Sequence, residues 1–330
     1  MKNEEIDFVV LWVDGSDPEW LKEKMNYKQD KNEHINGAIR FRDWDLLKYW
    51  FRGVEKYAPW VHKIYFVTWG HLPSFLNTDN DKVVIVNHQD YIEKKYLPTF
   101  NSNVLDLNLM NIKELSEKFV YFNDDMFLID DVKKSDFFKG DLPKDEYTES
   151  AIVPTEPEFP HNLLNNIYII NKHYKKRKWE NFSKKYNYKY GLKNILKTFC
   201  CSFYKNYVGF YNPHIPQAFL KSDFERLWEL EKDLCIQTSS NKFRTRFDIT
   251  QYLIRNIRLV TGQFEPRSSK FGKNFPINDN NQKAIEAIKK QKYKMICLND
   301  VTSDFDFDKA KNELIDAFES ILPEKSSFEK

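Results

Sequence analysis

The chain has 330 residues, of which 41% are hydrophobic and 16% aromatic, so it can bury one large core or two smaller ones. A charged fraction of 30% with a formal net charge of only +2 argues against global disorder and gives no overall sign of a nucleic-acid binder. We expect neither a secretory signal nor a membrane-spanning helix, because no cleavage site follows the first apolar run and no window approaches 18 uninterrupted apolar residues. The four cysteines form no CxxC pair, which favours free thiols in a reducing cytoplasm.

Four short apolar runs, each bounded by polar or turn residues, are predicted to be buried strands. They cover residues 6–13, 62–68, 82–87 and 119–122. Helical patterns at residues 43–57 and 104–116 lie between them, and Asp17-Pro18 is a favourable helix start after the first strand. This alternation predicts right-handed crossovers and a mostly parallel sheet, which binds its ligands beyond the carboxyl ends of the strands.

Beyond residue 140 the pattern changes. From Lys172 to Lys197 ten bases accompany a single acid, Glu180, with aromatic residues between them. This segment is either a solvated face or a surface for anionic lipid headgroups or a polyanionic glycan, and a nucleic-acid role is less favoured because no reader motif accompanies it. The remainder is predicted to be largely helical, at residues 216–233, 245–258, 281–290 and 308–321. We predict a single domain in three parts, namely an α/β core at 1–139, a basic helical insert at 140–200 and a helical part at 201–330 that completes the site.

The triplet Asn123-Asp124-Asp125 directly follows the fourth predicted strand. A hard divalent cation that binds a nucleotide diphosphate takes one or two carboxylates. Side chains alternate along a strand, so Asn123 and Asp125 would face the same way, and Asp125 is the preferred metal ligand with Asp124 second. Adjacent acids in a surface loop are often only solvated, and the position after a buried strand is what favours a site.

Asp14-Gly15-Ser16-Asp17 follows the first predicted strand and would lie at the same edge of the sheet. These residues suit an ordinary turn. They also suit a binding loop, in which Gly15 permits a close backbone approach while Asp14 and Asp17 hydrogen-bond a base or a ribose.

Arg40 and Arg42 stand two positions apart, so on an extended segment they point the same way and suit the oxygens of a pyrophosphate. The alternative is a surface salt bridge to Asp43 or Asp45.

His214 lies between two prolines in the segment Asn212-Pro213-His214-Ile215-Pro216. A rigidly held histidine has the geometry and the pKa range that a general base needs, although a lone loop histidine is more often structural. Further along, the segment FRTRFD offers arginines that can donate hydrogen bonds to phosphate and a carboxylate that can orient a histidine. An Asn-Asp pair follows the strand-like run KMICL. These residues are Arg244, Arg246, Asp248, Asn299 and Asp300.

Together these segments resemble the Stealth family, bacterial capsular polysaccharide phosphotransferases related to the animal GlcNAc-1-phosphotransferase that tags lysosomal enzymes. The resemblance covers four blocks. The first is DFVVLWVDGSDPEW at 7–20, and the second spans 40–128, from RFRDWDLLKYWF to FVYFNDDMFL. The third lies between 213 and 253, with PHIPQAFLKSDFERLWE and FRTRFDITQYL, and the fourth covers 294–329, beginning with KMICLND.

The resemblance implies a fold and an activity. The fold is similar to GT-A glycosyltransferases, a Rossmann-like, mostly parallel sheet flanked by helices. The activity uses a UDP-sugar, often UDP-N-acetylhexosamine, with Mg²⁺ or Mn²⁺, to build sugar-phosphate-sugar linkages in capsular or other cell-surface polysaccharide. By carry-over, the residues that line the site would be Asp14, Asp17, Arg40, Arg42, Asn123, Asp124, Asp125, His214, Arg246, Asp248, Asn299 and Asp300. Arg244 is an alternative to Arg246 in the third block.

On this interpretation an acceptor hydroxyl attacks the β-phosphorus of the donor and UMP leaves. Asp125 and Asp124 hold the metal, the arginines neutralise the phosphate, and His214 takes the proton with Asp248 or another carboxylate orienting it. Two alternatives stay open at this point: a glycosyltransferase that directs attack to the anomeric carbon and releases UDP, and a non-catalytic glycan-binding protein.

Overall fold

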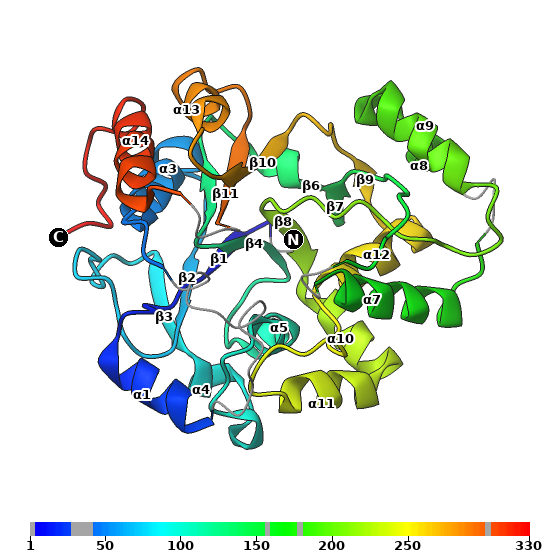
Figure 1. The fold of residues 1–330 in the computed structure, drawn as a ribbon, viewed down its shortest axis with the longest axis horizontal. Coiled ribbons are helices and arrows are strands. Elements are labelled where there is room, and N and C mark those ends of the chain that lie inside the picture. Colours follow the sequence, from blue (N-terminus) through cyan, green and yellow to red (C-terminus); the bar gives the residue numbers. More distant parts are fainter. Residues whose placement is uncertain (1–3, 28–41, 156–158, 177–180, 301–304) are drawn as a thin grey trace.

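The computed structural model describes residues 4–27, 42–155, 159–176, 181–300 and 305–330. Its centre is a five-stranded sheet with the order β3-β2-β1-β4-β8 (Figure 1). The strands are β1 (Ile6–Leu11), β2 (Ile64–Thr68), β3 (Val83–Asn87), β4 (Lys118–Asn123) and β8 (Gln217–Leu220). The first four run parallel, and β8 pairs antiparallel with β4 at the edge. This arrangement confirms the predicted α/β class with a mostly parallel sheet.

Both faces of the sheet are buried, because alternate side chains of each central strand point to opposite sides. Phe8 and Val10 of β1 belong to one hydrophobic cluster, whereas Val9 and Leu11 belong to the other. The first cluster includes residues of helices α3 (Leu47–Tyr57), α13 (Gln282–Lys289) and α14 (Phe307–Glu319). The second includes residues of α5 (Ser102–Leu107), α7 (Phe159–His173), α10 (Lys221–Leu230) and α12 (Tyr252–Thr261). The sheet is therefore a rigid platform, and its strand ends are fixed relative to one another.

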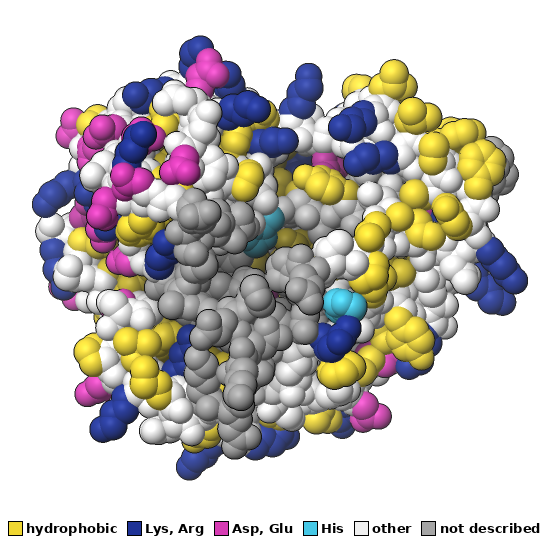
Figure 2. Space-filling model, viewed as in Figure 1, with side chains coloured by type: hydrophobic (Ala, Val, Ile, Leu, Met, Phe, Trp, Pro, Cys, Tyr) yellow, Lys and Arg dark blue, Asp and Glu magenta, His cyan; other side chains and the backbone are white. Residues whose placement is uncertain are grey.

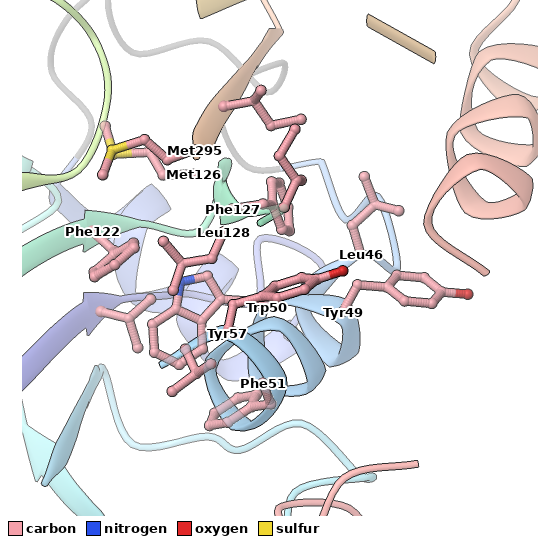
Figure 3. Packing of buried hydrophobic residues seen from close by; sticks show 14 of the residues in the cluster. Leu46, Tyr49, Trp50, Phe51, Tyr57, Phe122, Met126, Phe127, Leu128 and Met295 are labelled. Atoms are coloured by element: carbon pink, nitrogen blue, oxygen red, sulfur yellow. The ribbon is translucent and has the colours of Figure 1, made fainter. Parts of the chain in front are cut away.

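Helix α3 packs closely on the sheet and on the short strand β5 (Met126–Leu128) (Figure 3). The ring of Trp50 stands edge-on to Phe122, with 5.3 Å between ring centroids. Gly53 permits the close approach, since a Cβ atom there would lie 2.8 Å from the carbonyl oxygen of Leu128. Arg52 donates two hydrogen bonds to the carboxylate of Glu329, which ties α3 to the C-terminal segment.

Two small sheets flank the main one. In the first, β11 (Met295–Asp300) lies between β10 (Gly272–Ile277), to which it is parallel, and β5, to which it is antiparallel. The second consists of β6 (Phe138–Lys139), β7 (Leu142–Asp145) and β9 (Glu265–Pro266). The pairing of β11 with β5 brings the last third of the chain beside the residues that directly follow β4.

The other α-helices are α1 (Pro18–Tyr27), α4 (His88–Tyr91), α6 (Lys134–Phe137), α8 (Phe182–Lys185), α9 (Leu192–Cys201) and α11 (Lys232–Ser240). Short 3₁₀ turns occupy Lys94–Tyr96, Leu109–Asn111 and Tyr188–Tyr190. Within the described ranges, every helix is too short or too polar to traverse a lipid bilayer.

Three predicted helices were wrong in part. Residues 217–220, predicted as the start of a helix, form β8 because they pair with the open edge of β4. The helix predicted from residue 245 begins only at Tyr252, because the carboxylate of Asp248 holds residues 245–248 in a turn. The helix predicted at 104–116 ends at Leu107 and gives way to a 3₁₀ turn. The part at 201–330 is thus less helical than expected, since it also contributes β8, β9, β10 and β11.

Candidate active site

The loops after β1 and β4 lie at the same edge of the sheet. The two strands are parallel neighbours, and Leu11 pairs with Asn123 at their carboxyl ends. The loop that begins at Asp14 and the triplet at residues 123–125 therefore share one rim, as the alternation of strands and helices required. This rim is where parallel sheets hold ligands.

The first loop is ordered by its own hydrogen bonds. The carboxylate of Asp14 accepts from the backbone N–H and the hydroxyl of Ser16, and Gly15 lies in this turn. Asp17 caps α1, because its Oδ1 accepts from the backbone N–H groups of Glu19 and Trp20 at 2.9 and 2.8 Å. The Asp14 carboxylate thus shapes the turn, and the Asp17 carboxylate caps a helix. These hydrogen bonds do not test the contacts with a base or ribose that we predicted for the two residues.

His71, which we did not predict, holds this loop from the side of β2. Its Nε2 accepts the backbone N–H of Asp14 at 2.7 Å, so its proton sits on Nδ1, 3.6 Å from the carboxylate of Asp17. Burial lowers the pKa of His71 more than the Asp17 and Asp14 charges raise it, which keeps the ring neutral. The sequence signal was available, because His71 follows a predicted strand just as Asp14 does.

The centre of the rim is a cluster of three side chains that come from distant parts of the chain. The Nε2 atom of His214 lies 3.4 Å from Oδ2 of Asp125, and the Cys297 thiol donates to the same oxygen at 3.3 Å. The antiparallel pairing of β8 with β4 delivers His214, and the pairing of β11 with β5 delivers Cys297. The backbone also contributes, since the N–H of Leu298 donates to the carbonyl of Asp125 at 2.9 Å.

His214 is held on its other side by Tyr252 of α12. The Tyr252 hydroxyl lies 3.1 Å from Nδ1 of the imidazole. Burial raises the pKa of Tyr252, so the hydroxyl stays neutral and can only hydrogen-bond. Arg255, one turn further along α12, donates to the carbonyl of Tyr211 and the side chain of Asn212. Helix α12 therefore fixes both the ring of His214 and the loop that carries it.

Asn123 is fixed by a buried relay. The Tyr121 hydroxyl lies 2.7 Å from Oδ1 of Asp106 and 2.5 Å from Oδ1 of Asn123. Burial raises the pKa of Asp106 to about 7, against the lowering effects of Tyr121, Arg244 and His214. With Asn123 Oδ1 engaged, the NH₂ group of its amide is the part left for a ligand. Arg244, half-buried, donates to the hydroxyl of Ser102 at 2.5 Å and acts on the charge of Asp106, so it lies on this side of the rim.

Arg42 and Asp300, both predicted to bind substrate, form a salt bridge with each other. The guanidinium donates two hydrogen bonds to the carboxylate, at 2.9 and 3.1 Å, and the indole N–H of Trp44 donates to it at 3.2 Å. Burial raises the pKa of Asp300, and Arg42 and Trp44 partly offset that effect. The partner of Arg42 is therefore not Asp43 or Asp45, the alternatives weighed from the sequence. Arg40 lies outside the described residues.

Asp248, predicted to orient His214, has a different set of partners. Its carboxylate accepts hydrogen bonds from three asparagine amides and from the backbone and hydroxyl of Thr245; the asparagines are Asn101, Asn103 and Asn241. These bonds assign Asp248 to holding the Arg244–Asp248 turn, and the carboxylate in contact with His214 is that of Asp125. Arg246 is exposed and lies 3.3 Å from the ring of His161, and Asn299 precedes Asp300 at the end of β11.

The residues present fit a divalent cation at Asp125. Its Oδ1 atom is buried and has no hydrogen-bond partner within the described part of the chain, so it is left available to a ligand. Donor atoms of Asp125, His214 and Cys297 lie within 4.8 Å of one another. Burial, with the Asp125 charge, raises the pKa of Cys297 well above its usual range, so the thiol keeps its proton and positions Asp125.

Asp124 is the second carboxylate at this position. Protein atoms around it and the Asp125 charge raise the pKa of Asp124 to about 7, although its side chain keeps contact with solvent. Mg²⁺ and Mn²⁺ suit carboxylate oxygens, so Asp125 and Asp124 are the residues that would hold such an ion.

Open α/β sheets bind their ligands outside the carboxyl ends of the strands, and in this sheet carboxylates, an imidazole and a guanidinium gather there. Three family models match the chain, described as Stealth protein conserved region 1 (residues 4–31), conserved region 2 (residues 40–145) and conserved region 4 (residues 286–330). The chain therefore belongs to the Stealth family.

Two curated relatives align with nearly the full chain. It is 50% identical to the capsular polysaccharide phosphotransferase WcwK of Streptococcus pneumoniae, over 100% of both chains. It is 44% identical to the exopolysaccharide phosphotransferase cps2G of Lactiplantibacillus plantarum, over 99% of this chain and 96% of that one. A solved structure of the galactosyltransferase LgtC, with donor and acceptor sugar analogs, aligns with 96% of both chains at 12% identity and a TM-score of 0.40. The α/β class of this chain follows from its own sheet.

Proposed function

We propose that the chain is a polysaccharide phosphotransferase of capsule or exopolysaccharide synthesis. It moves a hexose 1-phosphate, such as an N-acetylhexosamine 1-phosphate, from a UDP-sugar to a hydroxyl of an oligosaccharide or polysaccharide, including one attached to a lipid carrier, and releases UMP. We place this reaction in the cytoplasm, where nucleotide sugars are available. The observation that carries the proposal is the meeting of Asp125 and His214 at the rim of the sheet, in a chain related over its full length to polysaccharide phosphotransferases.

The rim offers groups for each part of the donor. When bound, a Mg²⁺ or Mn²⁺ ion at Asp125 and Asp124 would neutralise the phosphate oxygens. Arg244 provides positive charge beside Asn123, whose amide NH₂ is free to donate to a phosphate or sugar oxygen. The loop from Asp14 to Asp17 lies next to this position and suits the uridine.

The proposed step is an in-line displacement at the β-phosphorus. The acceptor oxygen forms a bond to the phosphorus while the bond from that phosphorus to the bridging oxygen breaks, and UMP departs with that oxygen. Nε2 of His214 takes the hydroxyl proton, and Tyr252 on Nδ1 keeps the ring in place. The bond between C1 of the sugar and its oxygen is not broken, so the anomeric configuration of the donor is retained.

Product analysis tests the proposal against its two alternatives. We expect incubation with a panel of UDP-sugars, an acceptor glycan and Mg²⁺ or Mn²⁺ to release UMP and to give a phosphodiester signal in phosphorus NMR. Release of UDP without a phosphodiester would identify a glycosyltransferase instead. If the parent and an Asp125→Asn variant are equally inert with every donor and metal, the glycan-binding alternative is favoured.

Three variants assign the site. We expect Asp125→Asn and His214→Gln each to lower the transfer rate by about 10²–10⁴-fold, because each removes a group that acts on the reacting atoms. Asp131→Asn, a matched change of an exposed carboxylate six positions beyond Asp125, should retain the parent rate. Chelation with EDTA should abolish transfer, and added Mg²⁺ or Mn²⁺ should restore it.

A further inference from the structure

One side of the molecule carries an unusual concentration of exposed apolar side chains. Fifteen large hydrophobic residues are exposed in the described part of the chain, and eleven of them lie between Val153 and Tyr211. Figure 2 shows a group of hydrophobic side chains over α9, at the upper right of the molecule. Three of them lie on α9 and one lies just beyond it, namely Leu192 (80% exposed), Leu196 (57%), Phe199 (47%) and Phe203 (70%). We call these four residues the α9 stripe.

The stripe follows from how α9 is anchored. Only Thr198 and Cys201 of this helix are buried, and the Thr198 hydroxyl accepts the backbone N–H of Glu149 at 3.1 Å. The four stripe residues recur at intervals of four, three and four positions, so they share one face of the helix and its continuation, turned away from Thr198 and Cys201. A soluble helix usually presents polar residues to solvent, and this one presents leucine and phenylalanine.

Lysines border the stripe, and among the described residues no ion pair joins them to an acid. Lys193, Lys197 and Lys205 are exposed, and the sequence contains no Asp or Glu from Asn181 to Ser222. An apolar helix face with lysines along its side is the pattern of a helix that lies in the interfacial region of a bilayer. The apolar side chains then enter the acyl boundary, and the lysines meet the phosphates of anionic lipids.

We propose that the α9 stripe is a membrane-docking surface that binds the protein peripherally to an anionic lipid bilayer. The charge pattern favours this occupant over a second copy of the chain, because pairing two such faces would bring lysines against lysines. It also favours lipid over a polyanionic glycan, which lysines alone could bind and which gives no reason for exposed leucines. Docking needs no donor or acceptor, so it is independent of the proposed transferase reaction.

Vesicle sedimentation of the full chain tests the proposal. We expect the parent to sediment with vesicles of phosphatidylcholine and phosphatidylglycerol, weakly with phosphatidylcholine alone, and less as salt is raised. The triple variant Leu192→Ser, Leu196→Ser, Phe199→Ser should lower the partition coefficient at least tenfold. The double variant Lys193→Glu, Lys197→Glu should lower it about 25-fold or more on anionic vesicles and change it little on neutral ones.

Met25→Ser is the matched control, because Met25 is 68% exposed on α1, outside the α9 stripe, and should leave binding unchanged. The affected side chains are exposed, so the variants should unfold at the parent temperature; if the serine variant unfolds early, the lysine variant still decides. No sedimentation of the parent with anionic vesicles would overturn the proposal. So would a dimer in analytical ultracentrifugation that the serine variant dissociates, or soluble polyanionic glycan binding that depends on the lysines alone.

Discussion

The Tyr252 hydroxyl holds His214 at Nδ1, and Nε2, the proposed proton acceptor, faces the carboxylate of Asp125 at 3.4 Å. Under the proposed mechanism, a base that is already held in place loses little freedom when the acceptor arrives, so groups that never touch the substrate also affect the rate. Tyr252 is such a positioning residue, and Arg255 supports it through the loop that carries His214.

Replacing Tyr252 by phenylalanine should therefore slow transfer without weakening donor binding. We expect kcat to fall roughly three- to tenfold, the effect of one lost hydrogen bond, with KM for the UDP-sugar nearly unchanged. Steady-state kinetics of the variant beside Tyr57→Phe, whose hydroxyl accepts from Gln291, measures the difference. An unchanged kcat would show that Pro213 and Pro216 hold the ring without help.

Asp106 gives a prediction for pH. Burial raises its pKa in the folded chain to about 7, so between about pH 4 and 7 the unfolded chain releases a proton that the folded chain keeps. This group therefore favours folding at low pH, and its contribution is lost as the pH rises towards 7.

Asp106→Asn should remove that pH dependence. An amide oxygen can still accept a hydrogen bond from Tyr121. We therefore expect the free energy of unfolding of the variant, relative to that of the parent, to rise by a few kcal/mol between pH 5 and pH 8. Urea unfolding of both proteins at the two pH values measures the change in their stability difference. An equal difference at pH 5 and pH 8 would contradict the raised pKa.

The limits of the sequence are clearest at single residues. The edge shared by Asp14 and Asp125 followed from strand order, because parallel strands end at one rim. The salt bridge of Arg42 with Asp300, by contrast, joins residues 258 positions apart. The residues next to each of them in the sequence give no indication of this pairing. From the segment FRTRFD we predicted that Asp248 orients His214, and only the folded loop shows that amide donors surround its carboxylate.

At the level of elements, α3 makes a close contact at a residue without a side chain, Gly53, which lies against the backbone of β5. Its periodic apolar residues predicted a helix, and the structure confirms one at Leu47–Tyr57. The helix pattern says nothing of Gly53, which lies against the carbonyl oxygen of Leu128. The same limit applies to β8, whose apolar residues suit either a helix or a strand until the edge of β4 decides.

Gly53→Ala should destabilise the protein although alanine favours helices. The added Cβ would sit 2.8 Å from the Leu128 oxygen, so α3 or β5 must shift, at a cost of about 1–3 kcal/mol that exceeds the helix-propensity gain of about 1 kcal/mol. Denaturant unfolding of Gly53→Ala measures this loss of stability, with Asn312→Ala, an exposed change on α14, as the control. A stabilised Gly53→Ala variant would mean that the two elements separate easily.

At the scale of the whole molecule, the sequence showed that the insert is basic but did not predict which of its side chains are exposed. Ten bases between Lys172 and Lys197 marked a charged region, whereas the exposure of the α9 stripe depends on which side of α9 the body of the protein covers. The structure separates two surfaces, a polar rim at the strand ends and an apolar, lysine-bordered helix in the insert. In Figure 1 α9 lies apart from the central sheet, and Figure 2 shows hydrophobic side chains over α9.

The pairing of β11 with β5 has a consequence for how the protein is made. The thiol that holds Asp125 belongs to Cys297, and Arg52 near the start of the chain is fastened to Glu329. A ribosome that has released β1 to β8 has exposed a sheet in which Asp125 still lacks this support. The proposed active site can therefore form only after the residues of β11 have been synthesised, so a polypeptide interrupted before β11 would lack it.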